Sequence, residues 1–280
     1  MNFKTASHAS DPRLITIGVS HYCEKARWGL DWLQIPYVEE SYAPPFHRFI
    51  TARYGGSSVP ALVTTTDAFT DSTDILHFAD AIAPNNRRLY PHEPQLRCHV
   101  NDLEAWFDIQ LGISTRCWLY AQVIDHRQMM KQLWLPPNSG LGKLAFELTY
   151  PYMRQKVRKV YTVTPEGAAR SLQKIRRIFD QVGDWLAPGQ DYLVGDRFTA
   201  ADLTFAALAA PVLFPPEYGF KLPPLDQLPK EITSIIQSLR ETSAGAYGLR
   251  LYQDHRCGSK ERIHLSQHPL SLGRQLINRV

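Results

Sequence analysis

The sequence lacks the cysteine pairs that hold zinc or form a redox motif. Its four cysteines are far apart, and the 280 residues contain no CxxC or Cys/His cluster with zinc-ligand spacing. This absence excludes a zinc-finger or zinc-ribbon protein, and we expect no metal site. Isolated thiols are typical of a reducing compartment, so we expect a cytoplasmic protein.

The sequence also shows neither the pattern of a signal peptide nor that of a membrane-spanning helix. Residues 1–12 are polar where a signal peptide needs its apolar run. The longest apolar stretch, residues 203–214, is shorter than the roughly 20 residues that cross a bilayer. We therefore expect a soluble protein with no membrane partner.

Positive charge is scarce outside one end of the chain. Residues 245–280 contain six Lys or Arg and two acidic residues, which accounts for the whole net charge of +4. Residues 1–244 are therefore formally neutral. A protein that binds duplex nucleic acid is expected to carry a basic stripe on its folded body, so we expect no nucleic-acid partner.

The chain does have a globular composition and a mixed pattern in its first part. Strand patterns occupy residues 14–19, 37–41, 58–65 and 68–70. Between the first two, residues 21–33 place Ala26, Leu30 and Leu33 on one apolar helical stripe with charged residues opposite. A further helix begins after Asp71, a capping-type residue. The order β, α, β, crossover, β, β, α predicts a small α/β domain.

After a Pro- and Asn-rich segment the strand signals fade and helical signals follow. Apolar residues repeat at helical spacing at Val100, Leu103, Phe107 and Leu111, with Trp106, Ile109 and Ile113 on an adjoining face. We expect this helix to be buried on most sides. A second apolar stripe covers residues 172–186, whereas the order of the helices in residues 122–167 is not predictable.

One helix start in this region is unusually explicit. Thr199 is placed to cap a helix, and Asp202 is placed to reach back to the Thr199 amide, which makes a capping box. The predicted organisation is an α/β domain at 12–84, a linker at 85–95, an all-helical domain at 96–244 and a basic C-terminal extension at 245–280.

Four local patterns, in this order, resemble the glutathione transferase superfamily. They are Ser20-His21-Tyr22-Cys23 after the first strand, Val59-Pro60 before the third, Asp71-Ser72 at a helix start, and the Thr199/Asp202 capping box. The resemblance implies a thioredoxin-like domain followed by an all-helical domain, and a homodimer. It also implies an enzyme that transfers glutathione, its co-substrate, to a small hydrophobic electrophile.

By this resemblance, Ser20 is the catalytic residue. In the family the glutathione sulfur lies over the N-terminus of the first helix, where free amides favour an anion, and a serine hydroxyl can donate a hydrogen bond to the thiolate. Ser20 is also a good helix cap, and it can be only that. Tyr22 is a rival because other classes use a tyrosine hydroxyl. Cys23 stands at the resolving position of glutaredoxin-like relatives and leaves open a glutathione-dependent thiol-disulfide reductase.

The other patterns imply contacts to glutathione. Val59-Pro60 resembles the cis-proline whose preceding backbone pairs with the cysteinyl part of glutathione. Asp71 and Ser72 resemble the pair that binds the γ-glutamyl end. A basic contact to the glycine carboxylate is expected near His47 or Arg48.

Aromatic residues on the first helix of the second domain are candidates for the wall of the electrophile pocket. They are Trp106, Phe107, Trp118 and Tyr120. Most aromatics at such spacing belong to a core, so we expect one or two of them to line the pocket. A non-catalytic protein that binds glutathione or hydrophobic ligands on the same fold is the alternative function, because fold alone does not decide activity.

Overall fold

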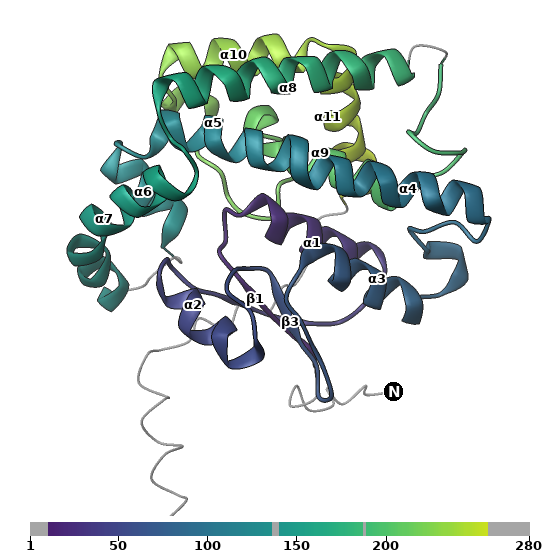
Figure 1. Ribbon diagram of the computed structural model, residues 1–280, viewed down its shortest axis with the longest axis horizontal. Helices are drawn as coiled ribbons and strands as arrows, with labels where there is room; N and C mark the ends of the chain where they lie inside the picture. The colour runs from purple at the N-terminus through teal and green to yellow at the C-terminus, as the bar shows by residue number, and fades with distance from the viewer. Residues whose placement is uncertain (1–10, 136–139, 187–188, 257–280) are drawn as a thin grey trace, which may run out of the picture.

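The computed structural model describes residues 11–135, 140–186 and 189–256. These residues form an α/β domain, drawn in the lower part of Figure 1, and an all-helical domain, most of which lies above it. This architecture confirms the predicted fold class.

The α/β domain contains a small mixed sheet. Its strands are β1 (Arg13–Thr16), β2 (Val38–Ser41), β3 (Ala61–Val63) and β4 (Ala68–Phe69), and its helices are α1 (His21–Trp32), α2 (Phe46–Thr51) and α3 (Ser72–Ile82). The strand order is β2-β1-β3-β4, in which β1 pairs parallel with β2 and antiparallel with β3, and β3 pairs antiparallel with β4. The parallel pair needs a crossover connection, which α1 supplies.

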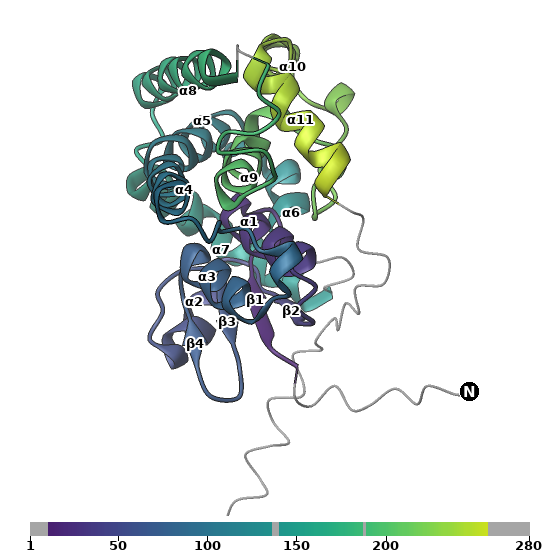
Figure 2. The ribbon, with the colours of Figure 1, turned by 90° about the vertical axis from the view of Figure 1, so that its right-hand side faces the viewer.

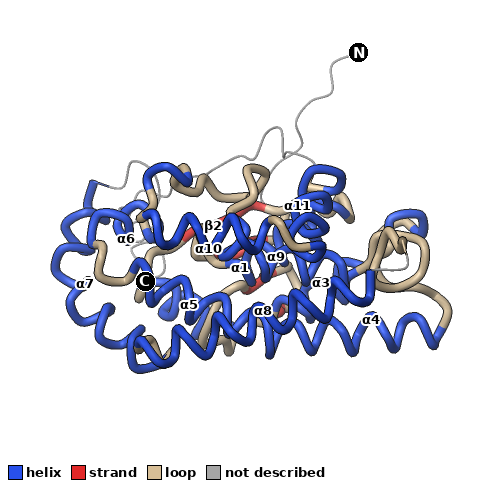
Figure 3. The backbone as a smooth tube through the Cα atoms, turned by 90° about the horizontal axis from the view of Figure 1, so that it is seen from above, coloured by secondary structure: helices blue, strands red, loops and turns tan. Residues whose placement is uncertain are grey.

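The second domain is helical in all the residues that the structure describes. Its α-helices are α4 (Pro94–Phe107), α5 (Ile113–Val123), α6 (Arg127–Trp134), α7 (Gly140–Val160), α8 (Pro165–Leu186), α9 (Ala200–Leu213), α10 (Lys230–Arg240) and α11 (Ser243–His255). Seen from above, α6 and α7 lie at the opposite end of the molecule from the start of α4 (Figure 3).

Helix α9 is the centre of the hydrophobic core. All 14 of its residues are buried, as expected for a helix that is apolar on every face. The predicted capping box at its start is confirmed, since the Thr199 amide donates to Asp202 Oδ2 over 2.7 Å and the reciprocal cap is present.

Helix α1 differs from the prediction on its charged side. It packs against α3 and against α9, and Figure 2 shows it between α9 and the strands. The stripe of Ala26 and Leu30 is buried, but Glu24, Lys25 and Arg27 on the other sides are buried too, each at most 1% exposed. Lys25 and Glu24 meet carboxylate and guanidinium partners from the helical domain, whereas Arg27 pairs with carboxylates of its own domain, so none of the three faces water.

The helix that begins the second domain is also less buried than predicted. Ile109 and Ile113 are 57% and 49% exposed. Between α4 and α5 the chain forms a π-helix at Asp108–Gly112, which rotates the side chains that follow it relative to a regular α-helix. The spacing alone could not reveal this change of phase.

The C-terminal boundary at residue 245 falls inside a helix. Helix α11 packs against α8 and α9, and Leu251 and Tyr252 are fully buried in the core of the helical domain. Residues 245–256 therefore belong to that domain and not to an extension. Residues 257–280 of the predicted extension lie outside the described residues.

Candidate active site at the N-terminus of α1

Ser20 caps α1 at the junction of the two domains. Its backbone is extended, and its hydroxyl accepts a hydrogen bond from the Cys23 amide at 3.5 Å, a long distance for such a bond. The side chain is partly exposed, and it also hydrogen-bonds with the Cys23 side chain, an interaction that lowers the pKa of the thiol against the larger effect of burial. Ser20 therefore combines a cap with a hydroxyl that is partly accessible to a ligand.

Tyr22 has its hydroxyl committed elsewhere. The phenol donates to the carbonyl oxygen of Asp108 at 2.7 Å. Burial raises the pKa of Tyr22 well above its ordinary value. A phenol held in this way is a poor donor to a thiolate, which favours Ser20 over this rival.

Cys23 lies on the inner side of the same turn. Its side chain is 0% exposed, and burial raises the pKa of the thiol to about 11. Because only the thiolate is a nucleophile, a buried thiol with a raised pKa is inert. This geometry weighs against a reductase that works through Cys23.

Val59-Pro60 forms a cis peptide bond immediately before β3. The ladder between β1 and β3 begins at Ala61, and no hydrogen bond engages the Val59 backbone within the described residues. The main chain of Val59 is thus free to pair with an extended ligand, as an added strand does.

Asp71 and Ser72 begin α3. The Asp71 carboxylate caps the helix by accepting a hydrogen bond from the Thr73 amide at 2.8 Å, while the residue remains exposed. Ser72 is 2% exposed. The ammonium group of Lys25 on α1 donates to the Thr73 hydroxyl at 2.8 Å, so this helix start lies beside the first half of α1.

His47 and Arg48 lie on α2. His47 is 9% exposed, and its Nδ1 has no hydrogen-bond partner among the residues that the structure describes. Burial, with a smaller effect from Arg48, lowers the pKa of its imidazole to about 4. The ring is therefore neutral at pH 7. Of the two residues only Arg48, whose side chain is exposed, offers a positive charge to a carboxylate.

The four predicted pocket aromatics separate into three environments. Phe107 is 0% exposed and packs against Phe205 in the core, with ring centroids 5.3 Å apart. Trp106 is partly buried and faces Trp185 of α8 at 5.7 Å. Both positions fit a role in core packing, which was the alternative to lining the electrophile pocket.

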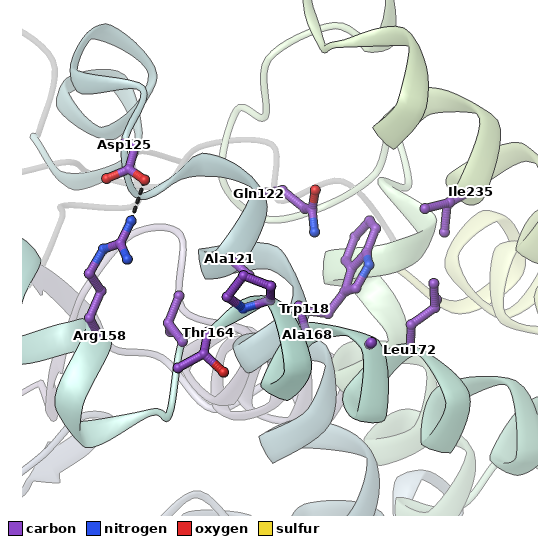
Figure 4. Close-up of a pocket in the computed structure, with 12 residues that line it drawn as sticks. Trp118, Ala121, Gln122, Asp125, Arg158, Thr164, Ala168, Leu172 and Ile235 are labelled. Carbon is purple, nitrogen blue, oxygen red and sulfur yellow. Dashed lines mark hydrogen bonds and ion pairs between the residues drawn. The ribbon is translucent and has the colours of Figure 1, made fainter.

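Trp118 lines a different cavity. A hollow of about 460 Å³ lies between α5, the start of α8 and α10, and includes Trp118, Gln122, Leu172 and Ile235 (Figure 4). None of its lining residues comes from the α/β domain. It is therefore not the site at the α1 N-terminus, whose position we take from Ser20 and its neighbours.

Tyr120 is the predicted aromatic that reaches the domain junction. It packs with Val19 of the β1–α1 loop against one apolar cluster, and its ring stacks on Tyr161 at 5.6 Å and an interplanar angle of 7°. Arg116 of α5 also lies over the Tyr161 ring, with its Cζ 4.3 Å from the ring centroid. The prediction missed Arg116 and Tyr161, which belong to no family motif.

The loop after α9 also reaches this junction. The Tyr218 hydroxyl donates to the Val19 carbonyl at 3.0 Å, and the Gly219 amide donates to Glu24 at 3.0 Å. Phe220 lies so close to Gly18 that a Cβ there would be 2.5 Å from its ring. Gly18 therefore permits this close approach, and the loop holds the residues just before Ser20 in place.

The described residues contain neither a metal-binding group nor a helix that could span a membrane. No group of three or more His, Cys, Asp or Glu within them is arranged to hold an ion. No described helix is both long and apolar enough to cross a bilayer.

Together, the fold and the α1 N-terminus define a thioredoxin-like protein with a candidate ligand site at its junction with a helical domain. The glutathione S-transferase N-terminal domain matches residues 14–87, and the glutathione S-transferase C-terminal domain matches residues 144–231. The chain therefore belongs to the glutathione S-transferase superfamily. No curated protein matches it.

Solved structures share the fold at low sequence identity. Beta-etherase LigF from Sphingobium sp. strain SYK-6 has a TM-score of 0.54 and 18% identity, covering 85% of this chain and 98% of its own. The theta class glutathione S-transferase from Xanthomonas axonopodis pv. citri, with glutathione bound, has a TM-score of 0.51 and 17% identity over 86% and 97%. Ure2p in complex with glutathione has a TM-score of 0.52 and 15% identity, and the match covers 87% of this chain and 95% of that one.

Proposed function

We propose that the protein is a glutathione transferase in which Ser20 holds the sulfur of glutathione as a thiolate. The observation that carries this proposal is the partly exposed Ser20 hydroxyl, which lies at the N-terminus of α1 and caps the helix through a long hydrogen bond of 3.5 Å. The helix amides and this hydroxyl together favour an anion at the same point. The thiolate then attacks an electrophilic carbon of the second substrate.

The rest of the site fits glutathione as the co-substrate. The unpaired backbone of Val59 can accept the cysteinyl part as an added strand, and Ser72 at the start of α3 can hold the γ-glutamyl carboxylate. Arg48 supplies a positive charge for the glycine carboxylate. The solved relatives that carry glutathione support this assignment at the level of the family.

The test replaces Ser20 with alanine and compares it with another capping residue. Thr242 caps α11 by accepting a hydrogen bond from the Gly245 amide at 3.0 Å, so Thr242→Ala removes a cap far from the site. Each variant is expected to lose about 1 kcal/mol of stability from its cap. We expect only Ser20→Ala to lower kcat/KM with an aryl halide, by roughly 10- to 100-fold, as for one charge-assisted hydrogen bond.

Other outcomes would assign other functions. Equal, small losses of activity in both variants would make Ser20 a cap alone. Binding of glutathione by calorimetry without turnover of any electrophile would favour a non-catalytic binding protein. If the protein reduces disulfides and this activity is lost in Cys23→Ser, the function is that of a thiol-disulfide reductase.

We also propose a homodimer and a cytoplasmic location. Leu96, Ile109 and Ile113, along α4, the π-helix and α5, are 38%, 57% and 49% exposed, an apolar surface that a second copy can cover. Cys23, Cys98 and Cys117 are free thiols, as in reducing compartments. Sedimentation of Ile109→Glu as a monomer would support the dimer, and an unchanged mass would contradict this interface.

A further inference from the structure

Arg116 is a partly buried cation without a carboxylate. In the described part of the chain its guanidinium makes no ion pair and no hydrogen bond, and its Nε is buried without any partner. Its Cζ lies 4.3 Å from the centroid of Tyr161 and 5.4 Å from that of Tyr22. The two rings hold the guanidinium by cation–π contacts but leave its N–H donors unused.

The position of Arg116 links it to the proposed active site. Tyr22 belongs to the first turn of α1, the helix that Ser20 caps. His21 lies in the same turn. Burial lowers the pKa of its imidazole to about 3, and the nearby positive charge of Arg116 contributes to this shift. The guanidinium therefore lies beside the helix end at which we place the thiolate.

The surroundings of Arg116 are aromatic. Tyr161 stacks on Tyr120, and both pack against the cluster that includes Val19. A flat aromatic molecule can lie against such rings. A guanidinium presents a planar fork of donors that matches a carboxylate, and the Nε of Arg116 is buried without an acceptor among the described residues, which costs free energy.

We propose that Arg116 binds a carboxylate on the second substrate, so that the protein acts on anionic aromatic electrophiles. This inference rests on the proposed transferase function and adds an anionic group to the hydrophobic electrophile that the sequence predicts. The carboxylate meets the guanidinium while the aromatic ring lies along the tyrosines. Arg116 thus selects the substrate and takes no part in bond making.

A matched pair of electrophiles tests the charge alone. The probes are 4-chloro-3,5-dinitrobenzoate and its neutral amide, 4-chloro-3,5-dinitrobenzamide. In both, the glutathione thiolate forms a C–S bond at the ring carbon that bears chlorine, the C–Cl bond breaks, and chloride leaves with its electron pair. The proton of the thiol goes to solvent.

Three variants of the full chain are compared through the ratio of kcat/KM for the carboxylate to that for the amide. Arg116→Gln is expected to lower this ratio about tenfold or more, the effect of losing one charge-assisted hydrogen bond. Arg116→Lys keeps the charge without the fork and should retain part of the preference. Arg177→Gln, an exposed residue of α8, should leave the ratio unchanged.

A second measurement separates this inference from the proposed function. Binding of 3,5-dinitrobenzoate, which has no leaving group, is followed by calorimetry in the wild type and in Arg116→Gln. If binding depends on Arg116 but neither probe is turned over, the result contradicts the transferase proposal and still supports the anion site. An unchanged carboxylate-to-amide ratio in Arg116→Gln overturns the inference, and a raised KM for glutathione in that variant would then assign Arg116 to glutathione.

Discussion

The buried cations of α1 and the cation Arg116 of α5 have opposite environments. Lys25 lies 3.0 Å from Glu104 and 2.7 Å from Asp108, and Arg27 lies 2.6 Å from Glu24 and 2.8 Å from Glu39. Arg116 of α5 lies over the rings of Tyr22 and Tyr161 and forms no ion pair with any residue that the structure describes. The buried cations of α1 are neutralised within the chain, Arg27 inside the α/β domain and Lys25 across the junction, whereas Arg116 has donors that no described carboxylate uses.

The strongest way to test this difference is to break a paired cation. Arg27→Met would leave Glu24 and Glu39 buried with less compensation, and Arg27 also donates to the Gly18 carbonyl at 2.5 Å. We expect the free energy of unfolding to fall by about 3–5 kcal/mol, as when one partner of a buried pair is removed. Urea denaturation measures this loss. A change below about 1 kcal/mol, like that expected for the exposed Arg177→Met, would contradict it.

A smaller loss is expected at Arg256. Its guanidinium lies 2.7 Å from both Glu24 and Asp31, but Glu24 keeps Arg27 as a partner and Asp31 is 20% exposed. Arg256→Met should therefore cost about 2–3 kcal/mol, less than Arg27→Met. Denaturation of the two variants side by side checks the order, and a larger loss in Arg256→Met would show that the pairs are not ranked by burial.

His21 adds a pH dependence next to the unpaired cation. It is 5% exposed, its Nε2 lies 3.0 Å from the Gly112 carbonyl, and its pKa falls from 6.5 to about 3 on folding. Between these values the unfolded chain binds a proton that the folded chain does not. The stabilisation is therefore complete above pH 6.5 and is lost as the pH falls toward 3.

The measurement compares urea denaturation at pH 6.5 and pH 5. The wild type should lose up to about 2 kcal/mol more than His21→Gln over this range. Glutamine can donate to the Gly112 carbonyl but does not titrate. Equal losses in the two proteins would mean that His21 takes up a proton in the folded state.

The smallest effect on stability is expected at Arg116. Arg116→Gln removes two cation–π contacts and leaves no carboxylate unpaired within the described residues, so it should cost no more than about 1 kcal/mol. The same variant is expected to change substrate preference. A loss as large as that of Arg27→Met would show that Arg116 is structural and would remove the contrast between the two kinds of cation.

Local patterns were enough to predict much of the fold. The caps at Asp71 and Thr199 depend on residues two or three positions away, and both form as expected. The environment of α1 was not predictable, because Lys25 finds Glu104 almost 80 residues later and the sequence does not show that the domains meet there. An amphipathic stripe identifies the apolar side of a helix, but not what covers its polar side.

The candidate site was predictable only where a family motif marks it. Ser20 and Val59-Pro60 belong to such motifs, and in the structure Ser20 is partly exposed at the start of α1 while Val59-Pro60 forms a cis peptide bond. Arg116 has no motif. Its only sequence signal is a single cation among apolar and aromatic residues of α5, and the absence of a partner is visible only when the chain is folded.

The contact between α1 and the end of α11 has a consequence for synthesis of the chain. Arg256 reaches Glu24 and Asp31, and the His255 carbonyl accepts a hydrogen bond from Trp28 Nε1 at 3.1 Å. More than 220 residues separate these partners, so the first domain leaves the ribosome long before its last contacts exist. Until α11 is made, the nascent α/β domain has Arg27 as the partner of Glu24 but lacks Arg256 as the partner of Asp31, so this face of α1 is completed only when the whole chain has been synthesised.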